Sequence, residues 1–436
     1  MRKQLAVLFT FLFFSIPAFA LDIQTSQTES GLNYWLVQDT SAPIVSFNLT
    51  FKSAGDAYTP DHLNGLGSIL STMLDQGAGP YDRKAFQDLL YKDAIQISAS
   101  ISPDGFSISG RTLKKNMATT AKLVNLMLTA PHFKDIDLQR TKDQLITSLR
   151  FTQQKPQYIA GKIWKETYFG DHPYGRKFDG TPESLQKVTA KDLHGFMQTH
   201  FALDNMVVSF AGDITQAEAA NTLTTMTTKL PAKNQAELLP KFIPHSTPPS
   251  PIFKEMDVPQ SILIFGQPFV GRNHPQFFEA AVLNQILGGS GGYPSQLNQI
   301  VRQDNGLVYY IYSNISLYDQ SARLMGAAGT RTETAGKAAR LTKEQWNLMR
   351  NKGPNKKSLA KTKKYMKGSY ALNLDSTQNI VGVLNVLQYY NLGTDYLDKR
   401  SALIDNVTAQ SVKTFAQEYL HPDALLFVTV GAKPTN

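Results

Sequence analysis

The sequence predicts an α+β protein built from two similar domains, and three observations support this prediction. Segments 188–212 and 407–431 align without a gap at a constant spacing of 219 residues, and each reads as a capped helix followed by a short apolar strand. A proline-rich stretch, 230–251, separates the two copies and is typical of a linker. Strand and helix patterns also mix without regular βαβ alternation, so we expect an antiparallel sheet in each domain, with helices packed on one face. The domains expected are 21–229 and 252–436.

The first twenty residues have the pattern of a secretory signal peptide. Arg2 and Lys3 precede an apolar run from Leu5 to Ile16, and Ala18-Phe19-Ala20 fits an A-x-A cleavage site. An N-terminal membrane anchor is the alternative, but the apolar run is short for a membrane span. We therefore expect cleavage after Ala20 and a mature protein in the periplasm or outside the cell.

The composition excludes several kinds of site. The chain has no cysteine, which excludes disulfide bonds, thiolate metal ligands and a cysteine-linked lipid anchor. The formal charge is +9, or +7 without Arg2 and Lys3, and much of the excess lies in 351–368. Tyr365 is the only aromatic residue of this run, so it is interpreted as a solvated helix face and not as a nucleic-acid surface. An acidic partner or a membrane surface is the remaining alternative for this run.

The first domain should begin with strands and continue with helices and a hairpin. Val45, Phe47, Leu49 and Phe51 alternate with polar residues, as in a half-buried strand. Pro103-Asp104-Gly105 is typical of a hairpin turn. The expected order is strands in 33–39 and 43–55, helices in 64–79 and near 84–92, a hairpin over 95–113, and a helical tract from 117 to about 154.

The helix expected in 64–79 has an unusual polar face. Its apolar stripe predicts a buried side, made of Leu66, Ile69, Leu70, Met73 and Leu74. The opposite side carries Ser68, Ser71, Thr72 and Asp75. The i, i+3, i+4 spacing of the three hydroxyl residues is one that places metal ligands on a single helical face in other proteins. Hydroxyl groups, however, neither bind zinc tightly nor act as a base near neutral pH.

The second domain carries a glycine-rich segment, 283–314. A helix is expected to end at these glycines, and a second helix to run from about Pro294 to Arg302. A turn at 304–306 then leads into a strand. A phosphate loop would require G-K-[ST], which is absent. A Ser290 nucleophile within G-x-S-x-G would require a preceding strand, whereas a helix precedes it. A flexible connection between two helices is therefore the favoured interpretation.

These segments resemble the pitrilysin, insulysin and mitochondrial processing peptidase family, the inverzincins. In that family a glycine-rich turn precedes a helix, an Arg, a Gly-Leu pair and a Tyr, which here are Arg302, Gly306-Leu307 and Tyr309. Segments 54–79 and 172–214 resemble the family's first domain, and the similarity extends over nearly all of the mature chain. The resemblance implies duplicated α+β domains that form half of a clamshell.

The resemblance also implies that a metal site has been lost. The family places H-x-x-E-H on the helix of 64–79 and a further Glu ligand on the long helical tract. The two His positions fall here on Ser68 and Thr72, the catalytic Glu on Ser71, and the distant Glu at or near Ser148. None of the eight His residues forms H-x-x-E-H or H-E-x-x-H, so we expect this chain to bind no metal or other cofactor.

Some bacterial members of the family divide the peptidase between two chains, one with the zinc motif and one that keeps the Arg and Tyr. The resemblance implies that Arg302 and Tyr309 bind the substrate backbone and the oxyanion in trans. The alternative from the residues alone is a helix-end cation and an ordinary strand aromatic. Tyr310 is expected on the opposite face of the strand.

The predicted function is that of a non-catalytic, zinc-less subunit of an exported two-chain zinc peptidase. Its expected partners are a zinc-bearing subunit, in a heterodimer or larger assembly, and a peptide substrate, with no nucleic acid and no membrane span. An inert structural or peptide-binding scaffold of the same fold is the alternative. An independent hydrolase that uses Ser290 is a third possibility.

Overall fold

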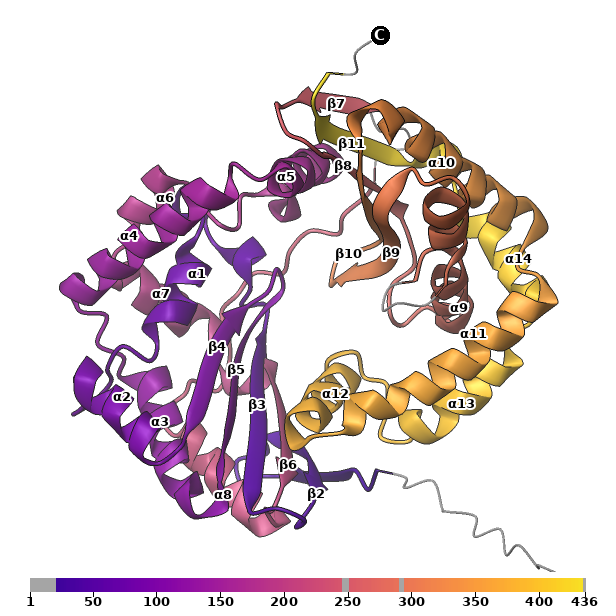
Figure 1. The fold of residues 1–436 in the computed structure, drawn as a ribbon. Helices are drawn as coiled ribbons and strands as arrows, with labels where there is room; N and C mark the ends of the chain where they lie inside the picture. Colours follow the sequence, from indigo (N-terminus) through magenta and orange to yellow (C-terminus); the bar gives the residue numbers. More distant parts are fainter. Residues whose placement is uncertain (1–20, 245–250, 290–293, 434–436) are drawn as a thin grey trace, which may run out of the picture.

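The structure is a computed structural model of the chain, and it describes residues 21–244, 251–289 and 294–433. The expected signal peptide and Ser290 lie outside the described residues. Two β-sheets, each flanked by helices, form the two halves of the molecule (Figure 1). Within the described ranges, no helix combines the length and the apolar composition that crossing a bilayer requires.

The first half contains a six-stranded sheet in the order β1-β2-β6-β3-β5-β4. Its strands are β1 (Gln24–Gln27), β2 (Asn33–Gln38), β3 (Ile44–Lys52), β4 (Gln96–Ile101), β5 (Gly105–Leu113) and β6 (Met206–Gly212). Its α-helices are α1 (Leu66–Met73), α2 (Arg83–Lys92), α3 (Met117–Thr129), α4 (Asp135–Thr152), α5 (Pro156–Phe169), α6 (Pro182–Lys187), α7 (Ala190–His200) and α8 (Gln216–Thr227).

The second half contains a five-stranded sheet in the order β7-β11-β8-β10-β9. Its strands are β7 (Ile252–Glu255), β8 (Ser261–Pro268), β9 (Val308–Tyr318), β10 (Ser321–Thr330) and β11 (Leu426–Gly431). Its helices are α9 (Phe277–Leu287), the π-helix η6 (Asn298–Asp304), α10 (Ala335–Lys352), α11 (Lys356–Gly368), α12 (Thr377–Tyr389), α13 (Tyr396–Asn406) and α14 (Ala409–Tyr419).

The predicted α+β class is confirmed, and the aligned segments form the same unit twice. In each copy a threonine caps the N-terminus of the helix. The side chain of Thr189 accepts a hydrogen bond from the backbone N–H of Asp192 in α7, and the side chain of Thr408 accepts one from the backbone N–H of Ser411 in α14. The strand that follows, β6 or β11, enters the sheet. Each sheet also contains one parallel pair, β2–β6 or β7–β11, which hydrophobic alternation does not reveal. The helical tract expected from 117 is split into α3 and α4, because Pro131 disfavours a continuous helix.

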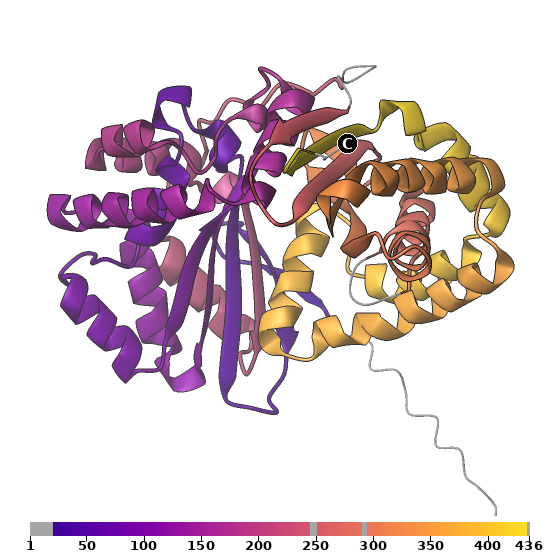
Figure 2. The same cartoon turned by 45° about the horizontal axis from the view of Figure 1, so that its top comes forward.

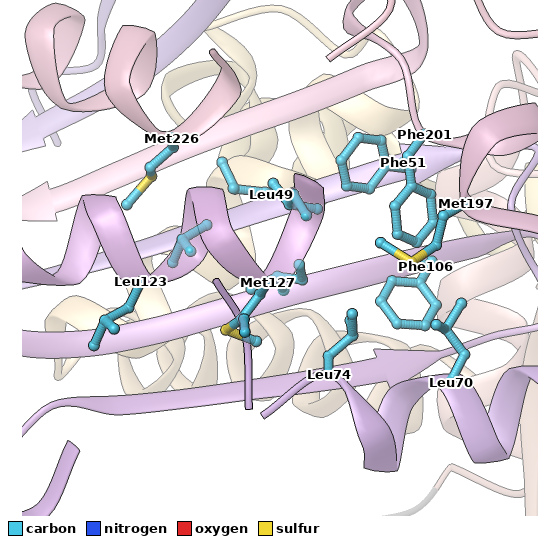
Figure 3. Close-up of a cluster of buried hydrophobic side chains, with 14 of the residues drawn as sticks. Leu49, Phe51, Leu70, Leu74, Phe106, Leu123, Met127, Met197, Phe201 and Met226 are labelled. Carbon is cyan, nitrogen blue, oxygen red and sulfur yellow. The ribbon is translucent and has the colours of Figure 1, made fainter. Parts of the chain in front are cut away.

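The core of the first half explains why α1 presents hydroxyl groups outward. Helix α1 packs its apolar stripe against the sheet and the neighbouring helices (Figure 3). The buried residues of β3 and α1 are Val45, Phe47, Leu49, Phe51, Leu66, Ile69, Leu70 and Met73, each 0–1% exposed. The fold of this helix therefore depends on its apolar side and leaves the opposite side free for chemistry or for substitution.

Each half contributes one helix to the sheet of the other half (Figures 1 and 2). Helix α5, from the first half, packs on β8 and β11 of the second. Trp164 of α5 is 1% exposed, and its indole N–H donates to the backbone carbonyl of Leu426 at 3.1 Å. The same contact contains the buried aliphatic residues Ile262 and Val428.

The reciprocal contact is made by α12, which packs on β3 and β6 of the first half. Here polar side chains contribute most of the specific bonds. The side-chain amide of Asn385 donates to Asn48 at 2.8 Å, and that of Gln388 donates to the hydroxyl of Ser209 at 2.7 Å. Since α5 begins at Pro156 and α12 at Thr377, the exchanged helices occupy corresponding places in the repeat.

Two equivalent hairpin turns meet where the halves join. Asp104, in the β4–β5 turn, accepts from the hydroxyl of Tyr174 and, at 3.1 Å, from the backbone N–H of Asp319 in the β9–β10 turn. Asp319 accepts in turn from the hydroxyl of Tyr389, at the end of α12, at 2.9 Å. Burial raises the pKa of Asp104 to about 6 and also raises that of Asp319. These bonds connect the exchanged helix to both turns.

Replacing Trp164 with Ala should lower the free energy of unfolding by about 3–5 kcal/mol, because it leaves a large cavity between α5 and the second sheet. Urea unfolding followed by circular dichroism measures this change. Tyr91→Ala, at a side chain that is 91% exposed, is the control and should have little effect. Equal midpoints for the two variants would contradict the importance of the exchanged helix.

Candidate functional site

The three hydroxyl residues of α1 lie on one face of the helix and bond within it. Ser68 and Ser71 are half-buried and Thr72 is exposed. The hydroxyls of Ser71 and Thr72 donate to the backbone carbonyl of Ser68, at 3.1 and 2.9 Å. Serine and threonine commonly satisfy their hydroxyl groups in this way inside helices. The helix that the resemblance assigns to a metal site is therefore present, and the hydroxyl groups of Ser71 and Thr72 are bonded to its own backbone.

Ser148 lies on the neighbouring helix, α4, which packs directly against α1. The hydroxyl of Thr141 on α4 lies 3.1 Å from the sulfur of Met73 on α1. Ser148 itself is exposed and lines a shallow groove on the open side of α4, together with the exposed Ile136 and Phe151. The position expected for the third metal ligand thus lies on the helix adjacent to Ser68, Ser71 and Thr72.

No alternative metal site was found among the residues that the structure describes. In those ranges no group of three or more His, Cys, Asp and Glu side chains is placed so that it could hold a metal ion. His194, in the middle of α7, packs against Phe133 with ring centroids 4.8 Å apart. His200 lies on the same helix, and its ring bonds to the backbone carbonyl of Ser53 at 2.7 Å.

A buried carboxyl beneath α1 was not predicted from the sequence. Asp56, just before α1, is 8% exposed, and its Oδ1 has no hydrogen-bond partner. A Cβ atom on Gly67 of α1 would lie only 2.6 Å from this oxygen, so a glycine is needed there. Burial raises the pKa of Asp56 to about 7. The negative charge of Asp179 adds to this effect, and the nearby Lys165 opposes it. An isolated Asp in an expected loop gives no periodic signal that would identify it.

Replacing Asp56 with Asn should stabilise the protein at pH 8 and have little effect near pH 4. Between pH 4 and 7 the unfolded chain releases the Asp56 proton while the folded chain keeps it, so the stability of the wild type falls as the pH rises. The variant has no charge to bury and should gain about 1–3 kcal/mol above pH 7. Urea unfolding at the two pH values tests this, with the exposed Asp171→Asn as control. A pH-independent difference would contradict the burial effect.

Arg302 and Tyr309 flank a fixed turn in the second half. Arg302 lies in the π-helix η6, and its backbone carbonyl accepts from the N–H of Gly306 at 2.9 Å. Gly306 has a φ of +60°, in the left-handed region that favours glycine. The side chain of Arg302 is exposed, and that of Tyr309 is 50% exposed. Both groups can therefore reach a ligand at this edge of the sheet.

A β-bulge lies at Tyr309. Val308 is opposite Thr330 and Tyr310 is opposite Gly329, so Tyr309 is the extra residue of β9. A bulge of this kind interrupts the alternation of side chains along a strand. No local pattern indicates this bulge, because the run of hydrophobic residues from Leu307 to Ile311 fits a regular strand equally well.

The prediction that Tyr310 lies on the opposite face from Tyr309 is therefore wrong. Val308 and Ile311 both belong to the buried core of the second half, which leaves both tyrosines between them outside that core. Tyr310 stacks on Tyr312 at 6.2 Å between ring centroids. Tyr309 and Tyr310 thus both lie outside the core, where the sequence predicted this only of Tyr309.

Both candidate regions lie at the edge of a sheet. Strand β4 is last in the first sheet and contacts α1, while β9 is last in the second sheet and contacts η6. On its outer side, neither strand pairs with another strand in the described part of the chain. Such an edge offers backbone N–H and C=O groups to an extended peptide. A peptide bound along β4 would lie beside the substituted face of α1.

Comparisons with known proteins show what the chain is similar to. Residues 187–366 match the model described as the peptidase M16 inactive domain. A Helicobacter pylori protein named non-peptidase homolog YmxG is 23% identical over 435 residues, which is 99% of each chain. A Bacillus subtilis protein named uncharacterized zinc protease YmxG is 23% identical over 351 residues, or 80% of this chain and 84% of that protein. The chain is therefore similar to the peptidase M16 family.

Solved structures have the same fold as this chain. A structure described as the peptidase M16 inactive domain from Pseudomonas fluorescens superposes with a TM-score of 0.88 at 24% identity, over 95% of this chain and all of that one. A structure described as a protease from Helicobacter pylori gives a TM-score of 0.81 at 16% identity, over 94% of this chain and 99% of the other. These superpositions show that the chain has the same fold as both proteins.

Installing histidines at the two family positions should create zinc binding that the wild type lacks. Ser68→His/Thr72→His places two imidazoles one helical turn apart on the same face of α1, where both can bind one zinc ion. Isothermal titration of the purified chain with ZnCl₂ measures this, and the single variant Ser68→His serves as control. Stoichiometric zinc in the purified wild type would contradict the loss of the site.

Proposed function

We propose that this chain is the zinc-less subunit of an exported two-chain zinc peptidase. One observation carries the proposal. The positions that the resemblance assigns to the metal site carry only hydroxyl side chains, whereas Arg302 and Tyr309 are exposed and flank a structured turn. A family member without catalytic use would have no need to keep this pair at a sheet edge. The description of the matched domain as inactive, and the non-peptidase name of the Helicobacter pylori relative, agree with a chain that does not cleave alone.

In this proposal the zinc belongs to the partner subunit and activates the attacking water there. The second half of this chain closes over the partner to complete a clamshell, so that Arg302 and Tyr309 face the partner's metal. Arg302 orients the peptide backbone through its fixed guanidinium fork. The Tyr309 hydroxyl donates a hydrogen bond to the oxyanion that forms during the attack. An unfolded peptide is held by adding a strand to a sheet edge. The expected signal peptide places this assembly in the periplasm or outside the cell.

The proposal is tested on the complex purified from its native compartment. The complex should contain zinc and should hydrolyse a quenched fluorescent peptide, and a chelator should abolish this activity. Reassembly with Arg302→Ala or Tyr309→Phe should lower kcat by more than about tenfold without preventing assembly. Tyr312→Phe is the matched control, because Tyr312 is also an exposed tyrosine of β9 but lies beyond the bulge.

Unchanged turnover in both variants would remove the trans-site proposal and leave the alternative of an inert peptide-binding or structural scaffold. Peptide hydrolysis by the isolated chain in the presence of chelator would favour an independent hydrolase instead. Gel filtration of each reassembled mixture shows whether a loss of activity comes from chemistry or from failed assembly.

A further inference from the structure

The internal repeat extends to the helices that cover the outer ends of the sheets. Helix α3 follows the 3₁₀ turn Lys114–Asn116, and α10 follows the corresponding turn Thr332–Thr334. The two helices begin 218 residues apart, at Met117 and Ala335. Residues of α3 can therefore be matched with residues of α10 one by one.

In the first half, helix α8 is packed on α3. Leu223 and Met226 of α8 are fully buried in the core, and Met226 lies near Leu123 and Met127 of α3 (Figure 3). The side-chain amide of Asn125 on α3 donates to the backbone carbonyls of Met226 at 3.1 Å and of Thr228 at 2.7 Å. Asn125 thus binds the C-terminal end of α8, where carbonyl groups lack partners within the helix.

In the second half, no helix covers the matching face of α10 within the described residues. An open groove of about 460 Å³ lies there instead, between α10, the edge strand β7 and the end of β11. Its walls are mainly apolar and include Phe253, Leu425 and Phe427, and its floor includes Gly336 and Ala339 of α10. Phe253 is 48% exposed although it lines this groove. Leu425 and Phe427 are buried at the base of the groove, so Phe253 is the exposed apolar residue at its rim among the three. An exposed apolar side chain beside an apolar groove favours a binding site.

Residues of the groove correspond to residues of α3 that lie beside α8. Gly336 and Ala339 match Ala118 and Ala121, which line the cleft between α3 and α8 in the first half. Small residues at such positions allow another helix to approach closely.

The polar residues correspond as well. Arg340 matches Lys122, and Lys343 takes the place of Asn125. Lys343 pairs with Asp423 at 2.8 Å, but the side chain of Asp423 is 96% exposed, and exposed ion pairs of this kind add little stability. Lys343 can therefore turn to the carbonyl end of a docked helix, where a cation is favourable.

We propose that this groove binds an amphipathic helix from a partner polypeptide, seated on α10 as α8 is seated on α3. The C-terminal end of the docked helix lies at Lys343, its apolar face contacts Phe253, Leu425 and Phe427, and acidic side chains on its flank meet Arg340. The inference is independent of the roles proposed for Arg302 and Tyr309. A helix is the expected occupant because α8 occupies the corresponding position on α3. Acidic side chains are expected on this helix because Arg340 and Lys343 are positively charged.

A synthetic peptide with the sequence of residues 215–230, which contains α8, is the probe. The fluorescein-labelled peptide is titrated with the full chain and binding is followed by fluorescence anisotropy. Gly336→Trp fills the groove, and a Cβ atom at this position meets no atom within 4 Å, so the host fold tolerates the change. Gly195→Trp on α7 is the matched control, since it is an exposed helical glycine with the same open surroundings.

We expect saturable binding to the wild type and to Gly195→Trp, and binding at least about tenfold weaker to Gly336→Trp. Lys343→Asn, which restores the residue of the first half, should keep the affinity, whereas Lys343→Glu should weaken it about two- to fivefold. Lack of binding by the wild type, or equal binding by both tryptophan variants, would overturn the proposal. Sedimentation that shows a wild-type dimer broken by Gly336→Trp would also overturn it, because a second copy would then occupy the groove.

Discussion

The reciprocal exchange of α5 and α12 is the contact on which the rest of this structure depends. Each sheet has its own helices on one face and relies on a helix of the other half for cover on the opposite face. Neither half can therefore cover both faces of its sheet alone. The exchange also fixes the relative positions of β4 and β9, the two strands whose edges carry the candidate site. The bonds between Asp104, Asp319 and Tyr389 add directional polar contacts to this apolar junction.

Helix α1 separates the residues that hold it in place from those that face outward. Leu66, Ile69 and Leu70 point into the core, whereas Ser68, Ser71 and Thr72 lie on the opposite side. The packing of the helix therefore depends little on these hydroxyl residues, and the hydroxyls of Ser71 and Thr72 bond to its own backbone. In the second half, Val308 and Ile311 of β9 pack in the core, whereas Tyr309 of β9 and Arg302 of η6 are exposed.

Much of this organisation could be predicted from local patterns. The capped helix and strand of each repeat, the apolar stripe of α1 and the hairpin turn at Asp104 all depend on neighbours in the sequence. What could not be predicted depends on distant partners. The bulge at Tyr309 is set by pairing with Gly329 and Thr330, and the burial of Asp56 is set by the packing of Gly67 above it. Trp164 and Asn385 lie in segments that read as ordinary helices. Nothing in these segments indicates that each helix packs on the sheet of the other half.

The helix exchange also determines when the chain can complete its fold. The Ser46 hydroxyl of β3 bonds to Thr377 of α12, 331 residues later, at 2.8 Å. The first sheet consequently keeps an uncovered face until almost the whole polypeptide is present, and loops of this length close slowly. A chain emerging from the ribosome cannot assemble its first half as a finished unit. Late assembly of this kind makes any product truncated before α12 a target for proteases and aggregation.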